Sequence, residues 1–575
     1  MQFVSSRLGL DDHHISLKPA AWLALMLISL AAMLPGFFNI PTMDRDEARY
    51  SQASRQMMET GDYVDIRFQE QARHVKPVGI YWMQVVTTAP FGGSEAPQWA
   101  HRLPSLFGCL IAVALTAWFG ARLGGSRAGF TAGLIMAVGL LMSVEARTAK
   151  TDAMLLASIT MAQVALYYIF HPPDSKEQKF VGWPLVFWLA QGAGLIIKGP
   201  IITLVSVTTL LALCLWRRDI SILKRLNLPV GLLVMFAVVL PWVVIITIQT
   251  QGGFIEESIG HALMGKVATG DDSHGGPPGY HTVGLLAMFW PATLLLVLAA
   301  VTAWQRRREP LVQYLIAWIV PTWVVFELVA TKLPHYVLPV YPAIAILAAF
   351  GVSDAAKLLS LRGVRIAHWI VTVLFVIATG LLAWLPYYLG PEIGAQNVPG
   401  AAILVVLAAL FVIGAGLFLA MKPTHDRVLP LAVSAVVYFL AMYQFTFPAF
   451  DKFWLTRGLD REVASLEGCD NIAFATLGYR EPSVVFTFGT QTLLASDERA
   501  VTHLQQNPSC GLLAVSQVEE ARFQQMLAER DLDVLSLGSV EGYNYVKGDE
   551  LVMTLYAGAQ TALTKVPGER DSQVN

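Results

Sequence analysis

Charge is scarce in this sequence. Of the 575 residues, only 14% are Asp, Glu, Lys or Arg, whereas 55% are hydrophobic, and an ordinary soluble domain has roughly a quarter charged residues. This balance excludes a purely soluble protein and predicts an integral membrane protein with some polar structure. The net charge of −2 gives no basis for nucleic-acid binding, so no nucleic-acid partner is expected.

Cysteine is scarce as well, because four residues are too few for a disulfide framework. Cys109 and Cys214 lie in apolar runs and are interpreted as packing residues. Cys469 and Cys510 lie in the polar C-terminal part, where they could pair if that part faces an oxidising compartment; the sequence leaves this open. Internal repeats and low-complexity tracts are absent from the sequence.

Long hydrophobic runs are abundant. A helix needs about 20 mostly apolar residues to span a membrane, and the sequence predicts about thirteen such spans, the first of them a retained anchor rather than a cleaved signal. The count is approximate because only Lys198-Gly199-Pro200 separates two of the runs. The predicted spans are 20–38, 103–119, 127–143, 152–170, 181–197, 199–216, 228–248, 283–303, 311–330, 335–351, 366–386, 401–420 and 428–447.

The charges of the loops predict the orientation. Lys and Arg gather in the loops after the even-numbered spans, as in 217–225 and 306–308, whereas the loops 249–282 and 387–399 are nearly free of them. Cytoplasmic loops carry the excess of Lys and Arg. The N-terminus is therefore expected in the cytoplasm of a bacterium and the protein in its inner membrane, with the loop 39–102 on the periplasmic side.

The composition changes near residue 450. Residues 1–450 are predicted to form a transmembrane domain whose loop 39–102 contains an interfacial helix at 78–91, with Tyr81 and Trp82 at the depth of the headgroups. In 451–575, short apolar runs alternate with helix-like segments. The runs "NIAFATL", "PSVVFTFG" and "CGLLAVS" predict strands, and the whole pattern predicts a small periplasmic α/β domain. No glycine-rich phosphate loop or nucleophile elbow occurs in this domain, so a lid or docking role is favoured.

Charged residues gather at the predicted outer face. The stretch "MDRDEARYSQ" (43–52) follows the first span directly, and cations lie at several outer turns where cations should be rare. Singly, such cations can merely snorkel to the headgroups, Asp46 and Asp152 can cap helices, and His274 can be an ordinary loop histidine. Together they favour a phosphate-binding site at the lipid surface. The cations and their neighbours are His74, Lys76, Arg147, Lys150, Lys198, His274, Lys332, His335 and Tyr336.

These motifs make the chain resemble the GT-C class of glycosyltransferases that use lipid-linked sugars. The nearest resemblance is to the family of the undecaprenyl-phosphate aminoarabinose:lipid A transferase, with a more distant one to the protein O-mannosyltransferases. The segments that carry it span about 300 residues in one order: "DRDEARYSQASRQMMETGDYV", "HVKPVGIYW", "ARTAKTDAMLLA", "GAGLIIKGP", the region of His274 and "TKLPHYVLPVYP". The resemblance implies a mainly α, polytopic GT-C fold with about thirteen membrane helices and a small outer α/β domain.

The resemblance also implies roles for individual residues. Asp46, beside Glu47, matches the catalytic carboxylate, and Asp152 matches a second acid of the site. Arg49 and Lys76 match cations near the lipid phosphate. The remaining matches are to outer-face positions of less defined role. They are Lys198, Lys332, His335 and Tyr336, and Arg147 and Lys150 join them as expected donor-binding cations.

The sequence establishes no cofactor, and a divalent metal ion is the one candidate that the resemblance leaves open. His274 matches a histidine that binds a metal in some members of the family. The family usually has Glu before the Lys-Pro pair, whereas this chain has Val75, preceded by His74. A site of that type would therefore need His74, Asp271 or Asp272 as the partner ligand.

The expected activity is transfer of a sugar, with inversion, from a polyprenyl phosphate to lipid A or another periplasm-facing envelope acceptor. Lys and Arg would stabilise the leaving phosphate. The Asp46 carboxylate would take the proton of the acceptor hydroxyl or orient an acceptor that is already ionised. Three alternatives remain at this stage: a protein O-glycosyltransferase of the same class, a transporter or flippase for the lipid-linked sugar, and a non-catalytic scaffold. A transporter should show paired broken spans in two related halves. The sequence shows no such pair, which counts against the transporter hypothesis.

Overall fold

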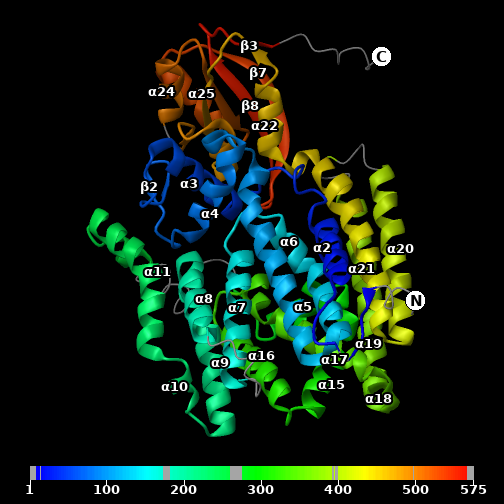
Figure 1. The fold of residues 1–575 in the computed structure, drawn as a ribbon. Coiled ribbons are helices and arrows are strands. Elements are labelled where there is room, and N and C mark those ends of the chain that lie inside the picture. Colours follow the sequence, from blue (N-terminus) through cyan, green and yellow to red (C-terminus); the bar gives the residue numbers. More distant parts are fainter. Residues whose placement is uncertain are drawn as a thin grey trace.

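The computed structural model describes residues 8–12, 14–172, 182–258, 275–390, 394, 399–496 and 498–565. Long helices run roughly parallel through most of the molecule, and a smaller region with a β-sheet lies across one end of them (Figure 1). The helices of the long bundle are α2 (Pro19–Met33), α5 (Gln98–Ala137), α6 (Leu140–Ala146), α7 (Asp152–Phe170), α8 (Trp183–Lys198), α9 (Ile201–Arg217), α10 (Ile222–Arg225), α11 (Leu228–Gln249), α12 (Gly253–Ile255), α14 (Tyr280–Met288), η5 (Ala292–Leu295), α15 (Leu296–Gln305), α16 (Pro310–Leu328), η6 (Pro334–Val340), α17 (Tyr341–Ser353), α18 (Ala355–Ser360), α19 (Arg362–Leu389), α20 (Pro399–Met421), α21 (His425–Phe439) and η7 (Leu440–Thr446).

The predicted spans fall on apolar helices. Within the described residues, eight helical segments are long and apolar enough to cross a membrane, and the bent pair of α14 with η5–α15 would make a ninth. The predicted spans at 20–38, 181–197 and 199–216 fall on α2, α8 and α9, which are shorter apolar helices. Two further predicted spans, 103–119 and 127–143, share the 40-residue helix α5, and the second continues into α6.

A glycine pair breaks α5 between those two spans. Gly125 has a φ of +87°, a conformation that residues with a Cβ rarely adopt. A Cβ at this position would also lie only 2.7 Å from the carbonyl oxygen of Asp12. The N-terminal segment packs against the break, where the Ser126 hydroxyl donates a hydrogen bond to the Asp11 carbonyl over 2.8 Å. The chain thus reverses direction at this break, so α5 consists of two helical halves.

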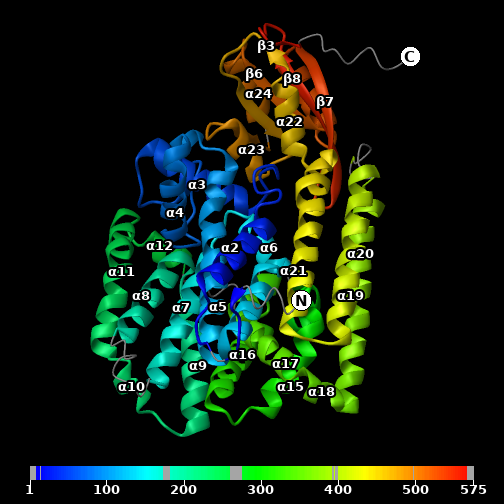
Figure 2. The same ribbon diagram turned by 45° about the vertical axis from the view of Figure 1, so that its right-hand side comes forward.

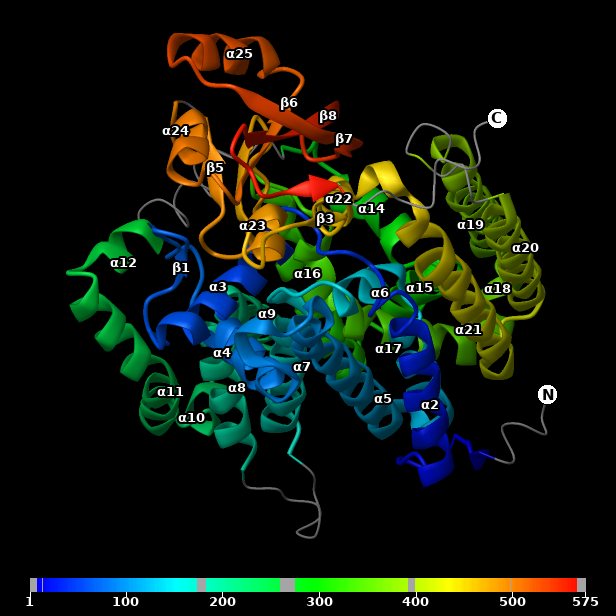
Figure 3. The same cartoon turned by 90° about the horizontal axis from the view of Figure 1, so that it is seen from above.

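Burial separates central from peripheral helices. Within the most apolar 18-residue window, 89% of residues are buried for η6–α17 but only 22% for α11. Seen from above, α11 and the α19–α20 pair lie at opposite edges, with α5, α7 and α17 between them (Figure 3). An apolar helix with little burial is suited to face lipid, so α11 is an outer wall of the bundle.

The first loop forms a small helical platform. It contains α3 (Asp46–Thr60), the strand pair β1 (Arg67–Phe68) and β2 (Gln71–Ala72), α4 (Gly79–Thr88), η1 (Ala89–Phe91) and η2 (Gly93–Glu95). The helix expected within 78–91 is present as α4. Its Trp82 is 38% exposed, but Tyr81 is fully buried against Tyr50, with ring centroids 5.4 Å apart. The expectation that Tyr81 lies among headgroups is therefore wrong, because α3 covers it.

The C-terminal region is built on a five-stranded mixed sheet of order β5-β4-β6-β8-β7. Its 3₁₀ turns, helices and strands, together with the short β3–β9 pair, are η8 (Phe447–Ala449), η9 (Asp451–Phe453), α22 (Leu455–Val463), β3 (Leu466–Glu467), β4 (Ala473–Leu477), α23 (Pro482–Phe488), β5 (Leu493–Ala495), α24 (Arg499–Gln506), β6 (Gly511–Ser516), α25 (Glu520–Glu529), β7 (Val534–Asn544), β8 (Asp549–Gly558) and β9 (Thr564–Lys565). A disulfide joins Cys469 to Cys510.

One predicted strand of this region is a helix. The run "PSVVFTFG" forms α23, with Pro482 in its first turn, a position where a missing N–H costs nothing. The helix lies beside α3 (Figure 2). Because short apolar runs fit a buried helix as well as a buried strand, the residue types alone did not distinguish the two.

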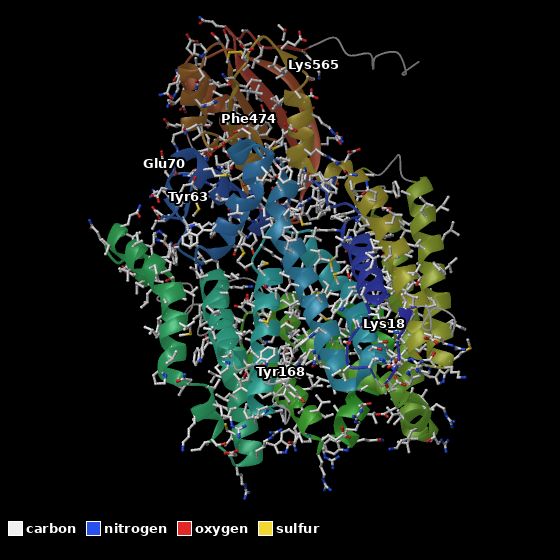
Figure 4. The ribbon with its side chains drawn as sticks, viewed as in Figure 1. Lys18, Tyr63, Glu70, Tyr168, Phe474 and Lys565 are labelled. Carbon is white, nitrogen blue, oxygen red and sulfur yellow. A yellow bond between two sulfur atoms is a disulfide. The ribbon has the colours of Figure 1, made fainter. Side chains whose placement is uncertain are left out.

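The platform and the sheet region lie at the same end of the bundle and are hydrogen-bonded to each other. The Gln52 amide donates to the Thr490 hydroxyl over 2.6 Å, and the Arg55 guanidinium donates to the Phe486 carbonyl over 2.8 Å. Figure 4 shows Tyr63 and Glu70 of the platform close to the sheet region that holds Phe474, whereas Tyr168 of α7 lies towards the other end. The sheet region is therefore docked onto the platform.

Candidate functional site

The N-terminus of α3 presents two adjacent acids in different directions. Glu47 is buried and accepts a bidentate pair of hydrogen bonds from Arg102, each of 2.9 Å. The backbone N–H groups of Met43 and Ala149 also donate to its carboxylate, over 2.9 and 2.8 Å. Both oxygens of Glu47 are thus occupied, which suits a residue that holds the platform in place. Its predicted catalytic role stays a prediction.

Asp46, by contrast, is exposed at the first turn of the helix. Its charge lies close enough to Arg49, Arg73 and Lys150 to favour the protonated form of each. The residue before it, Arg45, has a φ of +67°. Backbone in that region is strained for a residue with a side chain, and such strain often occurs at functional sites. The structure therefore places Asp46 at an accessible position among cations.

A second charged cluster lies where α7, α8 and η6 meet. Lys198, the last residue of α8, forms an ion pair of 2.5 Å with Asp152, the first residue of α7. His335 Nε2 lies 3.7 Å from the same Asp152 oxygen, and its ring packs edge-on against Tyr336. The short connection through Gly199 and Pro200 returns the chain at this point, so the predicted Asp152, Lys198, His335 and Tyr336 are brought together.

A cavity of about 570 Å³ opens beside this cluster. Asp152, Lys198, His335 and Tyr336 lie at its polar side, and Lys76 of the platform joins them. The remaining wall is almost wholly apolar and comes from α7, α8, α9, α11, α12, α16 and η6. Its apolar residues include Leu155, Leu195, Val239, Trp242, Phe254, Val325, Phe326 and Leu338. An apolar chamber with a cationic end is suited to a lipid with an anionic head.

Two predicted cations are engaged elsewhere. The buried Arg147 guanidinium donates hydrogen bonds to the carbonyls of Pro35, Ala32 and Ser143 and lies over the Tyr443 ring. Lys332 is nearly buried and donates to the Val329 carbonyl over 3.0 Å. Neither residue is among the described residues that line the cavity beside Asp152. The structure therefore does not bring Arg147 or Lys332 to that cavity.

Lys150 connects the two charged groups of the site. Its ammonium lies 2.9 Å from Glu145, a buried carboxylate at the end of α6. Burial alone would lower the pKa of Lys150, but Glu145, Asp152 and Asp46 together raise the pKa above its usual value. Lys150 therefore stays charged between Asp46 and Asp152.

Of the predicted metal ligands, only His74 lies in the described part of the chain. His74 is buried, with Nε2 2.7 Å from Asp65 and Nδ1 3.2 Å from Glu257. His274, Asp271 and Asp272 lie outside the described residues. Across the part of the chain that the structure does describe, no cluster of three or more His, Cys, Asp or Glu side chains could hold a metal ion.

Two residues of the site were missed in the sequence. Arg73 lies over the Tyr50 ring, 5.1 Å from its centroid, and both Tyr81 and Asp46 interact with its charge. Arg102 is the buried partner of Glu47. The sequence could have pointed to Arg73, because this residue directly precedes the motif "HVKP", which was assigned to the site. Arg102 gave none, since its partner lies 55 residues away.

The fold is similar to that of known membrane proteins. The fold matches the crystal structure of ArnT from Cupriavidus metallidurans in the apo state, with a TM-score of 0.71 at 19% identity over 94% of this chain and 99% of that one. The structure of the same protein bound to undecaprenyl phosphate matches with a TM-score of 0.70 at 19% identity, over 93% of this chain and 98% of that one. The chain is thus a polytopic membrane protein with the GT-C fold, and the predicted fold class is confirmed.

A family model and several named proteins are similar to this chain in sequence. Residues 20–252 match the family model described as dolichyl-phosphate-mannose-protein mannosyltransferase. Two relatives are named undecaprenyl phosphate-alpha-4-amino-4-deoxy-L-arabinose arabinosyl transferases. The one from Pseudomonas fluorescens (strain Pf0-1), whose name ends in 1, is 29% identical over 57% of this chain and 56% of its own length. The one from Erwinia tasmaniensis is 30% identical over 53% and 54%. The chain is a relative of these arabinosyl transferases and spans a little over half of their length, as the resemblance in its motifs indicated.

Proposed function

We propose that the protein is an inner-membrane glycosyltransferase that moves a sugar from a polyprenyl phosphate to lipid A or another envelope acceptor facing the periplasm. The observation that carries the proposal is the cavity, whose apolar wall ends at Lys76, Lys198 and Tyr336. The names of the relatives and the undecaprenyl phosphate in one structure of the same fold support a donor of this kind.

The donor would bind with its tail in the cavity and its phosphate at the cationic end. Lys76 and Lys198 would neutralise the phosphate, and Tyr336 could donate a hydrogen bond to it. Asp152 holds Lys198 and His335 at fixed positions. Because the site is largely buried, its charges would stabilise the developing phosphate anion more strongly than they would in water.

The acceptor hydroxyl would attack the anomeric carbon from the side opposite the phosphate. The new bond joins the acceptor oxygen to that carbon, the carbon–oxygen bond to the phosphate breaks, and polyprenyl phosphate leaves with the electron pair. The proton of the hydroxyl passes to the Asp46 carboxylate. This displacement inverts the configuration of the sugar.

The proposed orientation has the platform and the C-terminal domain, residues 451–575, in the periplasm. The Lys- and Arg-rich segments near α10 and α18 lie at the end of the bundle away from the sheet region (Figure 1). This separation supports a cytoplasmic location for those segments.

A second candidate acceptor is a protein hydroxyl. The family model that matches residues 20–252 is named for a protein mannosyltransferase, which supports a protein acceptor as the alternative. The donor site would be the same in both cases, so the two differ only in what approaches Asp46.

The test is Asp46→Asn in the purified protein with a polyprenyl-phosphate sugar and lipid A. We expect transfer to fall by at least about 100-fold, the usual contribution of a general base, while undecaprenyl phosphate binding and the melting temperature stay close to wild type. Glu70→Gln is the control, because Glu70 is an exposed acid of the same platform.

Wild-type turnover by Asp46→Asn would remove this residue from the mechanism. A wild-type protein that moves the labelled donor across the bilayer without forming a glycoside would replace the proposal with lipid transport. Transfer to a protein but not to lipid A would select the second candidate.

A further inference from the structure

A polar pocket lies where the platform, the start of α5 and the C-terminal region meet. It has a volume of about 260 Å³ and lies apart from the apolar cavity, with no lining residue in common. The pocket is smaller than the roughly 300 to 1,000 Å³ of sites for drug-sized ligands. Its size therefore suits a fragment no larger than about one sugar ring.

The floor of the pocket is a chain of hydrogen-bonding groups. The Tyr479 hydroxyl donates to Asp44 Oδ2 over 3.3 Å and lies 3.2 Å from the Thr456 hydroxyl, which is 2.6 Å from that of Ser483. Asp44, Thr456 and Ser483 line the pocket, and Thr487 is a further lining residue with a hydroxyl group. These groups can both donate to and accept from a ligand with several hydroxyls.

One side of the pocket is aromatic. The rings of Phe453 and Tyr545 stack with centroids 4.4 Å apart and planes only 8° from parallel, and both residues line the pocket. A flat aromatic pair beside a hydroxyl-rich floor offers an apolar face and many hydrogen bonds together. That combination fits the two faces of a sugar ring, which carries C–H groups on its faces and hydroxyls at its edge.

We propose that this junction pocket binds a sugar ring of the acceptor glycolipid. The inference rests on the proposed function and adds to it the place of the acceptor. Asp44 is two residues before Asp46, so a headgroup anchored here would lie next to the first turn of α3. From there its free hydroxyl could give its proton to Asp46 and attack the anomeric carbon of the donor. The apolar cavity remains for the donor, and the two substrates would reach Asp46 from different pockets.

Charge in the pocket favours this occupant over an anion. Asp44 and Asp460 both line it. Among the described residues that line the pocket, Arg457 is the one cation, and it is engaged with the Pro448 carbonyl and the Asp451 carboxylate at 2.6 and 3.0 Å. A phosphate would therefore meet two carboxylates without a free cation, whereas hydroxyl or amine groups of a sugar would be accepted.

The test is binding of lipid A in nanodiscs to the full-length protein in the absence of donor. Thr487→Val removes a lining hydroxyl while keeping the shape of the side chain, and Thr487→Trp fills the pocket. We expect the dissociation constant to rise about fivefold for the first, as for one lost hydrogen bond, and at least about tenfold for the second. Thr564→Val, on exposed β9 away from the pocket, is the matched control and should bind as wild type does.

Undecaprenyl phosphate binding serves as the second readout and should be unchanged in all variants. Unchanged lipid A binding by Thr487→Trp would overturn the pocket's assignment, as would an equal loss of lipid A and undecaprenyl phosphate binding. Since the assay contains no donor, a failure of sugar transfer would count against the proposed function while leaving this result intact. In a separate transfer assay, a higher KM of Thr487→Trp for the donor, with an unchanged KM for the acceptor, would also overturn the assignment. That result would place the sugar of the donor in the pocket.

Discussion

At the scale of single residues, neighbours in the sequence have separate tasks. Asp46 is exposed among cations, whereas Glu47 is enclosed by Arg102 and by two backbone N–H groups. Adjacent residues on a helix point about 100° apart, so one can reach the site while the other fixes the helix. The strained backbone of Arg45 adds to this fixed geometry.

Glu47→Gln should therefore destabilise the protein. The substitution leaves the buried Arg102 charge without its carboxylate, and losing one partner of a buried ion pair costs about 3 to 5 kcal/mol. We expect a clearly lower melting temperature in thermal unfolding of the purified protein, and the exposed Glu70→Gln control should melt as wild type does. An unchanged melting temperature together with lost transfer would instead give Glu47 a role in the chemistry.

At the scale of secondary-structure elements, α3 and the sheet region depend on each other. Thr490, directly after α23, receives a hydrogen bond from Gln52 and donates one to Glu59, both in α3. Asp44, at the entry to α3, is bonded to Tyr479 and Tyr545 of the sheet region. The docking contacts thus converge on the helix that presents Asp46.

Docking should weaken as pH rises through the titration of Asp44. Burial raises the pKa of Asp44 from 3.8 to about 6, although the nearby Ser483 and Tyr479 hydroxyls oppose the rise. The folded state therefore holds this proton more tightly than the unfolded state. Its contribution is present below pH 4 and is lost between about pH 4 and pH 6, by up to about 3 kcal/mol.

The measurement is unfolding of wild type and Asp44→Asn at pH 4.5 and pH 7. Other groups titrate in both proteins, so only the difference between them reports Asp44. We expect the stability of wild type relative to the variant to fall from pH 4.5 to pH 7, and a difference that does not change with pH would contradict the assignment.

The sequence predicted the positions of helices better than the contacts between distant segments. Apolar runs of spanning length predicted where apolar helices lie, although three of those helices are shorter than a full span. The α7–α8 cluster was expected because Asp152, Lys198 and His335 all lie at predicted outer turns. Short runs such as 482–488 were ambiguous, since neither periodicity nor residue type separates a buried strand from a buried helix. The Glu47–Arg102 pair, the enclosure of Arg147 and the junction pocket arise from contacts between distant segments, which no local pattern encodes.

At the scale of the whole molecule, the bundle has a chamber between its buried centre and a peripheral wall. The inner side comes from α7 and η6, and the outer side from α11, which is mostly exposed. A substrate in this chamber would lie against lipid-facing structure along its length. The wall can therefore be changed without disturbing the central packing.

Val239→Trp tests whether the chamber holds the lipid tail. Val239 lines it from α11, and a bulky ring there should occupy the space of the tail and weaken undecaprenyl phosphate binding by at least about tenfold. Leu233→Trp is the matched control, because Leu233 is on the same helix and 71% exposed. Equal affinity in the two variants would place the tail elsewhere.

The enclosure of Arg147 has a consequence for how the protein is made. Helix α2 is short, and the carbonyls of Ala32 and Pro35 at its end receive their hydrogen bonds from a guanidinium more than 100 residues further along the chain. Unpaired carbonyls are costly where water is scarce. As the chain leaves the ribosome, the first helix would remain incompletely satisfied until α6 is synthesised and inserted. We therefore expect the first helix to reach its final hydrogen bonding only after a later segment is made, so a chain truncated before residue 147 should be a preferred target of membrane quality control.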